Sequence, residues 1–222
     1  MRYAAALLLL AACIDPLDPQ WQLDHDHVVV ARATPPRIHA GDTTTLDALV
    51  AHAGGPATVE SPLSATTSAG TMRQAGDTWT LVAPDAATMA RLGMPVDGPV
   101  PVEVVMSFAH GTDRALAPIE VKKTVWIGDP STNPDMPAIT VAGAPAGDAI
   151  VVPLDRDVYL STTVPAGWHV NWLTSVGTLH QDDQPTSYLH VVKKDHQSGE
   201  LACVVRDDQG GVAWKVWPLR TQ

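Results

Sequence analysis

The chain has 222 residues, and its 24 acidic against 14 basic side chains give a net charge of −10. This balance argues against nucleic acid or an anionic lipid surface as a partner, because both require a basic surface. The length suffices for two domains of roughly 100 residues each. No apolar stretch reaches the roughly 20 residues that a transmembrane helix needs.

The first 13 residues follow the pattern of an export signal. Arg2 precedes an apolar run, and the run ends in Leu10-Ala11-Ala12-Cys13. These four residues resemble the lipobox of bacterial lipoproteins. The resemblance implies that residues 1–12 are a signal peptide and that Cys13 is lipidated and becomes the first residue of the mature protein. A plain secretory signal is the alternative.

Residues 13–20 contain two prolines and no periodicity, which predicts an extended stem. The resemblance to lipoproteins implies a location in the cell envelope, with the lipid bilayer as partner of the acylated Cys13. In lipoproteins of enteric bacteria, Asp directly after the cysteine favours retention in the inner membrane. Here Ile14 follows the cysteine and Asp15 comes one later, so we expect the outer membrane.

Strand signals dominate from Trp21 onward. A first unit over residues 21–127 contains β-branched or alternating runs at 27–31, 43–52, 78–82, 102–108 and 121–127. One helix is predicted at 85–92, because Asp85 is a favourable N-cap residue and Gly93 follows the last turn.

Residues 128–137 combine three prolines with turn-forming residues, which predicts a linker. A second unit over 138–222 repeats the strand pattern. Its predicted strands cover 138–141, 157–164, 168–174, 188–192, 201–205 and 212–217.

The two units share an internal repeat. Ser68–Gln74 matches Ser175–Gln181, and residues 102–111 align with 201–210. The second alignment places Cys203 on Val104, a predicted core position. The two units are therefore expected to share one fold.

Two segments of the second unit resemble strands of bacterial immunoglobulin-like domains. They are Trp168-His-Val-Asn-Trp172, followed by Ser175-x-Gly-Thr-Leu, and Gly199-Glu-Leu-Ala-Cys-Val-Val-Arg-Asp-Asp. The resemblance implies an all-β fold of two tandem immunoglobulin-like β-sandwiches, with one short helix in the first. The sequence lacks the two-cysteine bridge of that family, and the first unit has Ala65 where the second has Trp172.

Cys203 lies in a strand-like run, which predicts a buried thiol without a partner. A reactive thiol is the first alternative. The second is a disulfide with Cys13, which would require the plain secretory signal.

The sequence offers two groups of metal-competent side chains. Asp24-His25-Asp26-His27 would place two ligands on each face of a strand, which leaves either face incomplete as a zinc site. Asp182-Asp183 and Asp207-Asp208 lack the spacing of a calcium loop and are interpreted as turn residues. We expect no metal site and no cofactor.

Ser175 and the histidines of the second unit do not form a recognisable hydrolytic motif. No nucleophile elbow surrounds the serine, which lies in a repeated turn whose first copy lacks those histidines. The histidines are His169, His180, His190 and His196. We expect no catalytic residues.

The chain has seven tryptophans and one phenylalanine. Trp79 and Trp172 are predicted to fill the cores, whereas Trp21, Trp168 and Trp217 are candidates for a binding surface. We expect a membrane-anchored extracytoplasmic lipoprotein with a non-catalytic binding, adhesion or envelope-assembly role. Its partner would be another envelope protein or a surface polymer. The alternative is a carbohydrate-binding accessory, or a metal-binding lipoprotein, that uses the Trp- and His-rich second unit.

Overall fold

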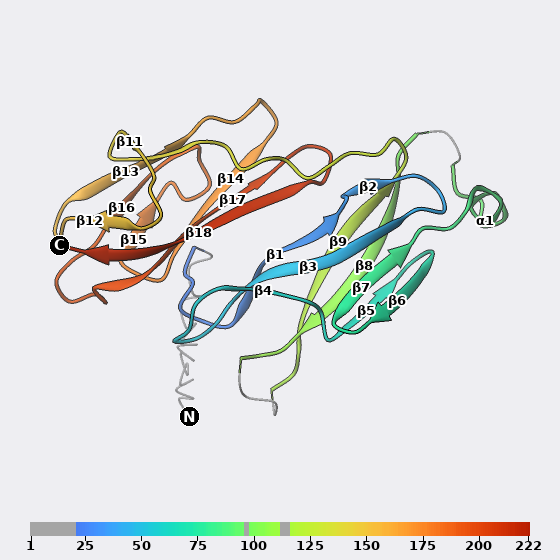
Figure 1. Ribbon diagram of the computed structural model, residues 1–222, viewed down its shortest axis with the longest axis horizontal. Helices are drawn as coiled ribbons and strands as arrows, with labels where there is room; N and C mark the ends of the chain where they lie inside the picture. Colours follow the sequence, from blue (N-terminus) through green and yellow to red (C-terminus); the bar gives the residue numbers. More distant parts are fainter. Residues whose placement is uncertain (1–20, 96–97, 112–115) are drawn as a thin grey trace, which may run out of the picture.

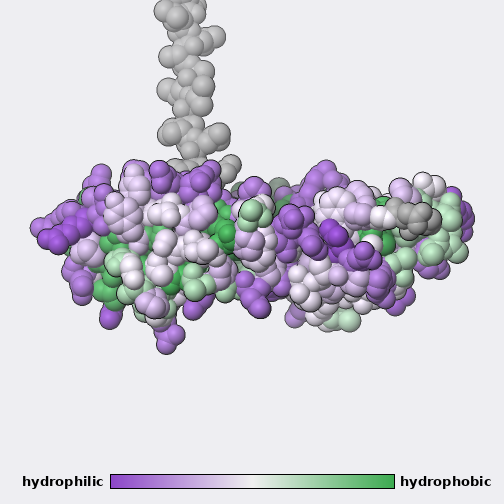
Figure 2. All heavy atoms as spheres, turned by 90° about the horizontal axis from the view of Figure 1, so that it is seen from above, coloured by the Kyte–Doolittle hydropathy of each residue, from purple (hydrophilic) through white to green (hydrophobic). Residues whose placement is uncertain are grey.

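The computed structural model describes residues 21–95, 98–111 and 116–222, so the expected signal peptide, the stem and Cys13 lie outside the described residues. Two β-sandwiches follow one another along the longest axis of the molecule (Figure 1). The face shown in Figure 2 is mainly hydrophilic, with small apolar patches on both halves. No helix within the described residues is long and apolar enough to cross a membrane.

The first sandwich consists of two mainly antiparallel sheets that face each other. One sheet has the order β1-β3-β7-β6, with β4 also paired to β3, and the other has the order β2-β9-β8-β5, in which only β2 runs parallel to its neighbour. The strands are β1 (His27–Thr34), β2 (Arg37–Ile38), β3 (Thr43–Ala51), β4 (Thr58–Glu60), β5 (Ser64–Thr67), β6 (Thr71–Ala75), β7 (Thr78–Val82), β8 (Val100–Phe108) and β9 (Ile119–Ile127).

The second sandwich repeats this strand order, except that its extra short strand β11 pairs with the first strand β10, whereas β4 pairs with the second strand β3. Its sheets are β11-β10-β13-β16-β15 and β12-β18-β17-β14, and β12 again runs parallel to the last strand. The strands are β10 (Ile139–Val141), β11 (Ala144–Pro145), β12 (Ile150–Val152), β13 (Asp157–Thr162), β14 (His169–Thr174), β15 (Thr178–His180), β16 (Thr186–His190), β17 (Ser198–Arg206) and β18 (Val212–Thr221).

This order is that of immunoglobulin-like sandwiches, in which strands A, B, E and D oppose strands C, F and G. The predicted fold of two tandem immunoglobulin-like β-sandwiches is therefore confirmed. The predicted helix is also present as α1 (Ala86–Arg91). The Asp85 side chain accepts a hydrogen bond from the backbone N–H of Thr88 at 2.7 Å, which caps the helix and lowers the pKa of Asp85.

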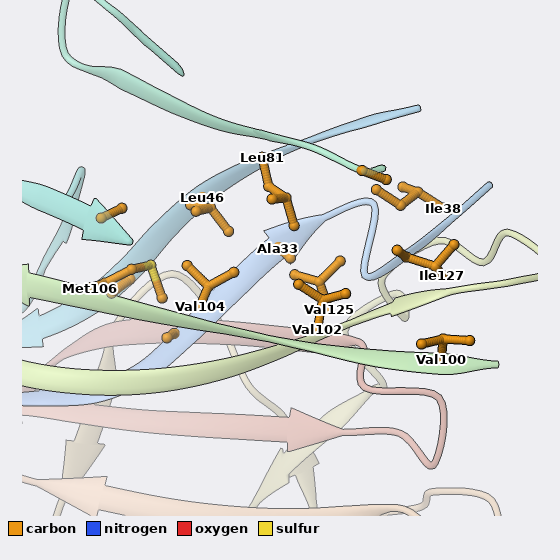
Figure 3. Packing of buried hydrophobic residues seen from close by; sticks show 14 of the residues in the cluster. Ala33, Ile38, Leu46, Leu81, Val100, Val102, Val104, Met106, Val125 and Ile127 are labelled. Carbon is orange, nitrogen blue, oxygen red and sulfur yellow. The ribbon is translucent and has the colours of Figure 1, made fainter. Parts of the chain in front are cut away.

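Each sandwich has its own apolar core between its sheets. In the first, alternating side chains of β8 such as Val102, Val104 and Met106 point toward Leu46 and Leu81 of the opposite sheet (Figure 3). This is the period-2 pattern by which a strand buries one face.

The second core contains larger aromatic side chains. Trp172 of β14 lies opposite Cys203 of β17, and both are fully buried. At the equivalent place in the first sandwich, Ala65 of β5 lies opposite Met106 of β8. In the second sandwich the larger residue of the pair, Trp172, is on the earlier strand, β14. In the first sandwich the larger residue, Met106, is on the later strand, β8, so a large side chain fills this place in both cores.

The internal repeat forms the same turn in both sandwiches. The Ser68 hydroxyl accepts the backbone N–H of Glu103 at 3.0 Å, and the Ser175 hydroxyl accepts that of Glu200 at 2.8 Å. In return, the serine backbone N–H groups donate to the carbonyl oxygens of the same glutamates. The repeated sequence therefore ties the end of β5 or β14 to its neighbouring strand.

This pairing corrects the alignment of the last strands. Glu103 corresponds to Glu200, so Cys203 corresponds to Met106 and not to Val104. The sequence alignment was wrong by two residues because alternating apolar strands match equally well after a shift of two. The shift keeps the same face, so the expectation that Cys203 lies in a core is unaffected.

A third apolar cluster lies between the two sandwiches. It joins side chains on the outer faces of β1 and β3 to side chains on the outer faces of β14, β17 and β18. Its buried members are Leu23, Val30, Leu49, Ala51, Leu173, Ala202, Val204 and Val212. Two polar contacts flank it: the Arg32 guanidinium stacks on the Trp214 ring at 3.9 Å, and Glu200 accepts the backbone N–H of Ala57 at 2.7 Å.

Two connecting segments also bind both sandwiches. Within residues 128–137, the Asn133 side chain donates to the Ala33 carbonyl oxygen at 2.9 Å and accepts the Val212 backbone N–H at 2.9 Å. At the start of the described chain, Leu23 donates its backbone N–H to Thr174 of β14, and Thr174 donates its own to Trp21. Residues 21–23 therefore extend the second sandwich before the chain enters the first.

Candidate functional site

A row of aromatic rings crosses the outer face of the second sandwich. Tyr159 of β13 pairs directly with Tyr188 of β16, and Tyr188 pairs with His180 of β15. Because these three residues share one line across the sheet, their side chains lie on one face. The ring centroids of Tyr159 and Tyr188 are 6.0 Å apart, and His180 stacks on Tyr188 at 4.7 Å.

This aromatic row is open to solvent on one side. Tyr159 is 63 % exposed, His180 is exposed and Tyr188 is partly buried by its two neighbours. Leu160 and Leu189, next to the tyrosines in sequence, are fully buried in the core. The core residues thus fix the strands, and the strands hold the rings on a rigid sheet.

Polar side chains surround the row. On one side, His190 Nδ1 and the Asp157 carboxylate are 2.7 Å apart. On the other side, the hydroxyl groups of Thr140 and Ser161 are 2.6 Å apart. The face therefore presents flat aromatic rings between hydrogen-bonding groups, which suits recognition of a partner that is partly apolar and partly polar.

The three tryptophans predicted for a binding surface lie elsewhere. Trp217 is only 1 % exposed and lies in the second core, so its candidacy was wrong; its position in β18 points it inward between the sheets. Trp21 and Trp168 are partly buried and pack against the same core. Trp172 fills that core as predicted, and Trp79 packs against the first core while partly exposed.

The Asp24–His27 segment does not alternate as a strand, because residues 24–26 form a bend between the contact with β14 and the start of β1. Asp26 turns toward the loops of the first sandwich, where it accepts the backbone N–H of Ala53 at 2.9 Å. His25 and His27 stack with ring centroids 4.4 Å apart. Among residues 21–95, 98–111 and 116–222, no group of three or more His, Cys, Asp and Glu side chains could hold a metal ion.

The hydroxyl of Ser175 belongs to the repeated turn, where it accepts a backbone N–H as Ser68 does. Asp207 likewise serves a turn, since its carboxylate accepts the backbone N–H groups of Gln209 and Gly211 at 2.9 and 2.6 Å. Both contacts are of the kind that stabilises a scaffold.

Sequence reasoning missed the aromatic row although part of its signal was present. Tyr159 and Tyr188 each occupy the polar position of an alternating strand, where an exposed aromatic residue is unusual. Their adjacency depends on the pairing of β13 with β16, which the alternation alone does not reveal.

No family model matches this chain, and no curated protein matches it. Three solved structures match over most of this chain, at low sequence identity and low TM-score. The N-terminal Ig1-2 module of Drosophila receptor protein tyrosine phosphatase DLAR is 11 % identical, with a TM-score of 0.30 over 89 % of this chain and 99 % of that one. Murine CEACAM1b is 13 % identical, with a TM-score of 0.31 over 87 % and 99 %. The Yersinia pseudotuberculosis adhesin InvE is 14 % identical, with a TM-score of 0.24 over 88 % and 60 %. At these TM-scores the likeness adds nothing about function, and the fold rests on the strand order of the two sandwiches.

Proposed function

We propose that this chain is a lipoprotein of the bacterial cell envelope, anchored through Cys13, with a non-catalytic binding or adhesion role. The binding face is the outer face of the second sandwich. The observation that carries the binding role is the row of Tyr159, Tyr188 and His180, because aromatic rings held on a rigid sheet are what a recognition surface uses. Anchoring is supported by Leu10-Ala11-Ala12-Cys13, with the outer membrane as the proposed location.

The start of the described chain supports a body held close to its membrane. Trp21 binds beside β14 at the junction of the sandwiches, so a tether would join the molecule near its middle. The eight residues from Cys13 to Trp21 can span at most about 28 Å when fully extended. Such a short tether would keep both sandwiches near the bilayer surface.

A carbohydrate is the partner class that the aromatic row favours. The apolar C–H faces of sugar rings pack on aromatic rings, while sugar hydroxyl groups require donors and acceptors beside them. Asp157, His190, Thr140 and Ser161 supply such groups around the rings. An envelope protein with an apolar segment is the other partner class, and both would use the same face.

Anchoring is tested by Cys13→Ser. The variant is expected to leave the detergent phase in a two-phase partition of whole cells, whereas the native protein remains in it, because even a single acyl chain adds about 0.8 kcal/mol of membrane affinity per buried methylene. A native protein that partitions to the aqueous phase, or a variant that still enters the detergent phase, would overturn the lipid anchor.

The binding face is tested by Tyr159→Ala. We expect roughly tenfold weaker binding to glycans on an array, or to envelope fractions, because truncation of an aromatic side chain in an interface costs about 1–2 kcal/mol. Leu63→Ala is the matched control, because Leu63 is 60 % exposed on the first sandwich. Equal binding by the two variants would contradict the assignment of this face.

A further inference from the structure

A groove runs between the two sandwiches beside the apolar cluster that joins them. It has a volume of about 420 Å³, and β1 and β9 of the first sandwich and β14 and β17 of the second line it. A smaller hollow of about 300 Å³ continues it, since both share Val28, Val29 and Arg206. The smaller hollow is lined in addition by His25 and His27.

Two cations from different sandwiches meet in this groove. Lys123 lies on the core-facing side of β9, opposite Val104, and its ammonium leaves the sandwich edge to donate to the carbonyl oxygen of Gly210 at 2.7 Å. Arg206 at the end of β17 donates to the side-chain oxygen of Asn171. Both contacts are to neutral oxygen atoms.

Neither cation forms an ion pair with a carboxylate within the described ranges of the chain. Two acidic residues line these spaces: Asp207, whose carboxylate accepts two backbone N–H groups of its own turn, and Asp182, which lines the hollow with Arg206. Desolvation, and then the charge of Arg206, lower the pKa of Lys123 to about 8, and desolvation lowers the pKa of Arg206 as well. Two neighbouring, partly buried cations without a carboxylate in direct contact are unusual, because buried charges are normally paired.

His27 adds an unpaired donor or acceptor to the same hollow. Its Nδ1 contacts the His25 carbonyl oxygen at 3.0 Å and must therefore carry a proton, which leaves Nε2 to face the hollow. This Nε2 atom is buried and has no hydrogen-bond partner in the part of the chain that the structure describes. When it is protonated, Nε2 becomes a third donor in a hollow that already contains Arg206.

We propose that this groove binds a tetrahedral oxyanion, a phosphate or sulfate group, between Lys123 of the first sandwich and Arg206 of the second. The anion supplies the direct ion pair that neither cation has, and its oxygen atoms accept from both side chains at once. Because the two cations belong to different sandwiches, a bound oxyanion also strengthens the junction. The site does not depend on the lipid anchor or on the aromatic row, and it would stand if either proposal failed.

Sulfate is the first probe, because it does not titrate around pH 8, where Lys123 does. We expect saturable binding in calorimetry, measured with the Cys13→Ser chain at constant ionic strength with chloride replaced by sulfate. Lys123→Met should weaken binding roughly tenfold or more, the loss expected for one charge-assisted hydrogen bond, and Lys123→Arg should retain it. Lys194→Met is the control, since it removes the same charge from an exposed turn.

The pH dependence of the native sequence provides a test that needs no variant in the groove. The ammonium of Lys123 is charged below its pKa, so sulfate affinity should fall as the pH rises above about 8. Bound sulfate raises the pKa of Lys123, which shifts this loss of affinity to higher pH. The other titratable groups facing the site are Lys122, Arg206, Asp182, Asp207, His25, His27 and His169. Burial lowers the pKa of His27, so that this side chain adds charge only at acid pH.

A last comparison distinguishes a free oxyanion from a lipid headgroup. Inorganic phosphate is titrated in solution, and vesicles of phosphatidylglycerol in phosphatidylcholine are sedimented with the same protein. Phosphate binding without sedimentation supports a free anion, and sedimentation that Lys123→Met abolishes supports a headgroup. Two outcomes would overturn the site. The first is that neither sulfate nor phosphate binds saturably and that no sedimentation depends on Lys123. The second is that the native and Lys123→Met chains bind equally. Sulfate stabilises proteins generally, so a higher melting temperature alone does not count as binding.

Discussion

The reactivity of the Cys203 thiol is set by its burial in the core of the second sandwich. It is fully buried opposite Trp172, and desolvation raises its pKa to about 12. Thiolate is the reactive form of cysteine, so this thiol is inert while the sandwich is folded. The structure thus places Cys203 as a small apolar side chain of the core.

Cys203→Ser is expected to destabilise the chain by about 1–3 kcal/mol, because the hydroxyl group has to be buried in an apolar core. In the native sequence, alkylation of Cys203 should be slow until denaturant opens the second sandwich. Denaturant melts and labelling time courses check both points, with the Cys13→Ser chain used throughout so that one thiol is present. Rapid labelling of the folded protein would contradict the buried thiol.

At the scale of the element, the repeated turn has the same glycine requirement in both sandwiches. Gly70 and Gly177 have φ angles of +89° and +76°. A Cβ atom at either position would lie 2.4 Å from a backbone carbonyl oxygen, that of Val82 or of His190. The glycine is therefore needed both for the left-handed backbone and for the close approach of the neighbouring strand.

Gly70→Ala and Gly177→Ala should each destabilise their sandwich. The loss should exceed that caused by the same substitution at a turn glycine that has no close neighbour. Gly54→Ala is the control: its φ is +70° and no atom lies within 4 Å of the added Cβ, so only the backbone strain of about 1–2 kcal/mol applies. The two repeat variants should lose roughly 1–3 kcal/mol more, the cost of overpacking. Equal losses in all three, measured by chemical denaturation, would show that the turn relaxes.

At the scale of the whole molecule, the two sandwiches form one body because apolar side chains on their outer faces are buried against each other. The segment that enters the first sandwich belongs to this junction: Leu23 is 1 % exposed and lies in the cluster between the sandwiches. Asn133 adds hydrogen bonds to both sandwiches from residues 128–137. Each sandwich therefore has its own core and also buries apolar side chains against its neighbour.

Leu23→Ala should cost about 2–5 kcal/mol, as expected for a leucine truncated in a packed interior. Leu63→Ala changes the same side chain at a position that is 60 % exposed, and its effect should stay within about 0.5 kcal/mol. Calorimetric melts of both variants provide the comparison. A Leu23→Ala chain that melts like the native one would show that the junction contributes little to stability.

The sequence by itself determined the class of fold, because alternation along single strands shows which face is buried. Val102, Met106 and Phe108 of β8 lie in the core as predicted, and α1 follows its capping residue. The repeat of Ser68–Gln74 in Ser175–Gln181 indicated two copies of one fold. Short strands such as β2, β11 and β12 were not predicted, since two or three residues show no periodicity and pairing alone defines them.

The tertiary structure decided which residues meet. A period of two is unchanged by a shift of two residues, so the correspondence of Cys203 with Met106 was fixed by the strand register and by the hydrogen bonds of Glu103 and Glu200. In β17 the run from Leu201 to Val205 is buried on both faces, and only the docking of the first sandwich explains the face that carries Ala202 and Val204. Tyr159 beside Tyr188, and Lys123 beside Arg206, come from strands far apart in the chain. Local pattern determines how a strand presents its side chains, whereas long-range pairing determines their neighbours, and both proposed sites consist of neighbours.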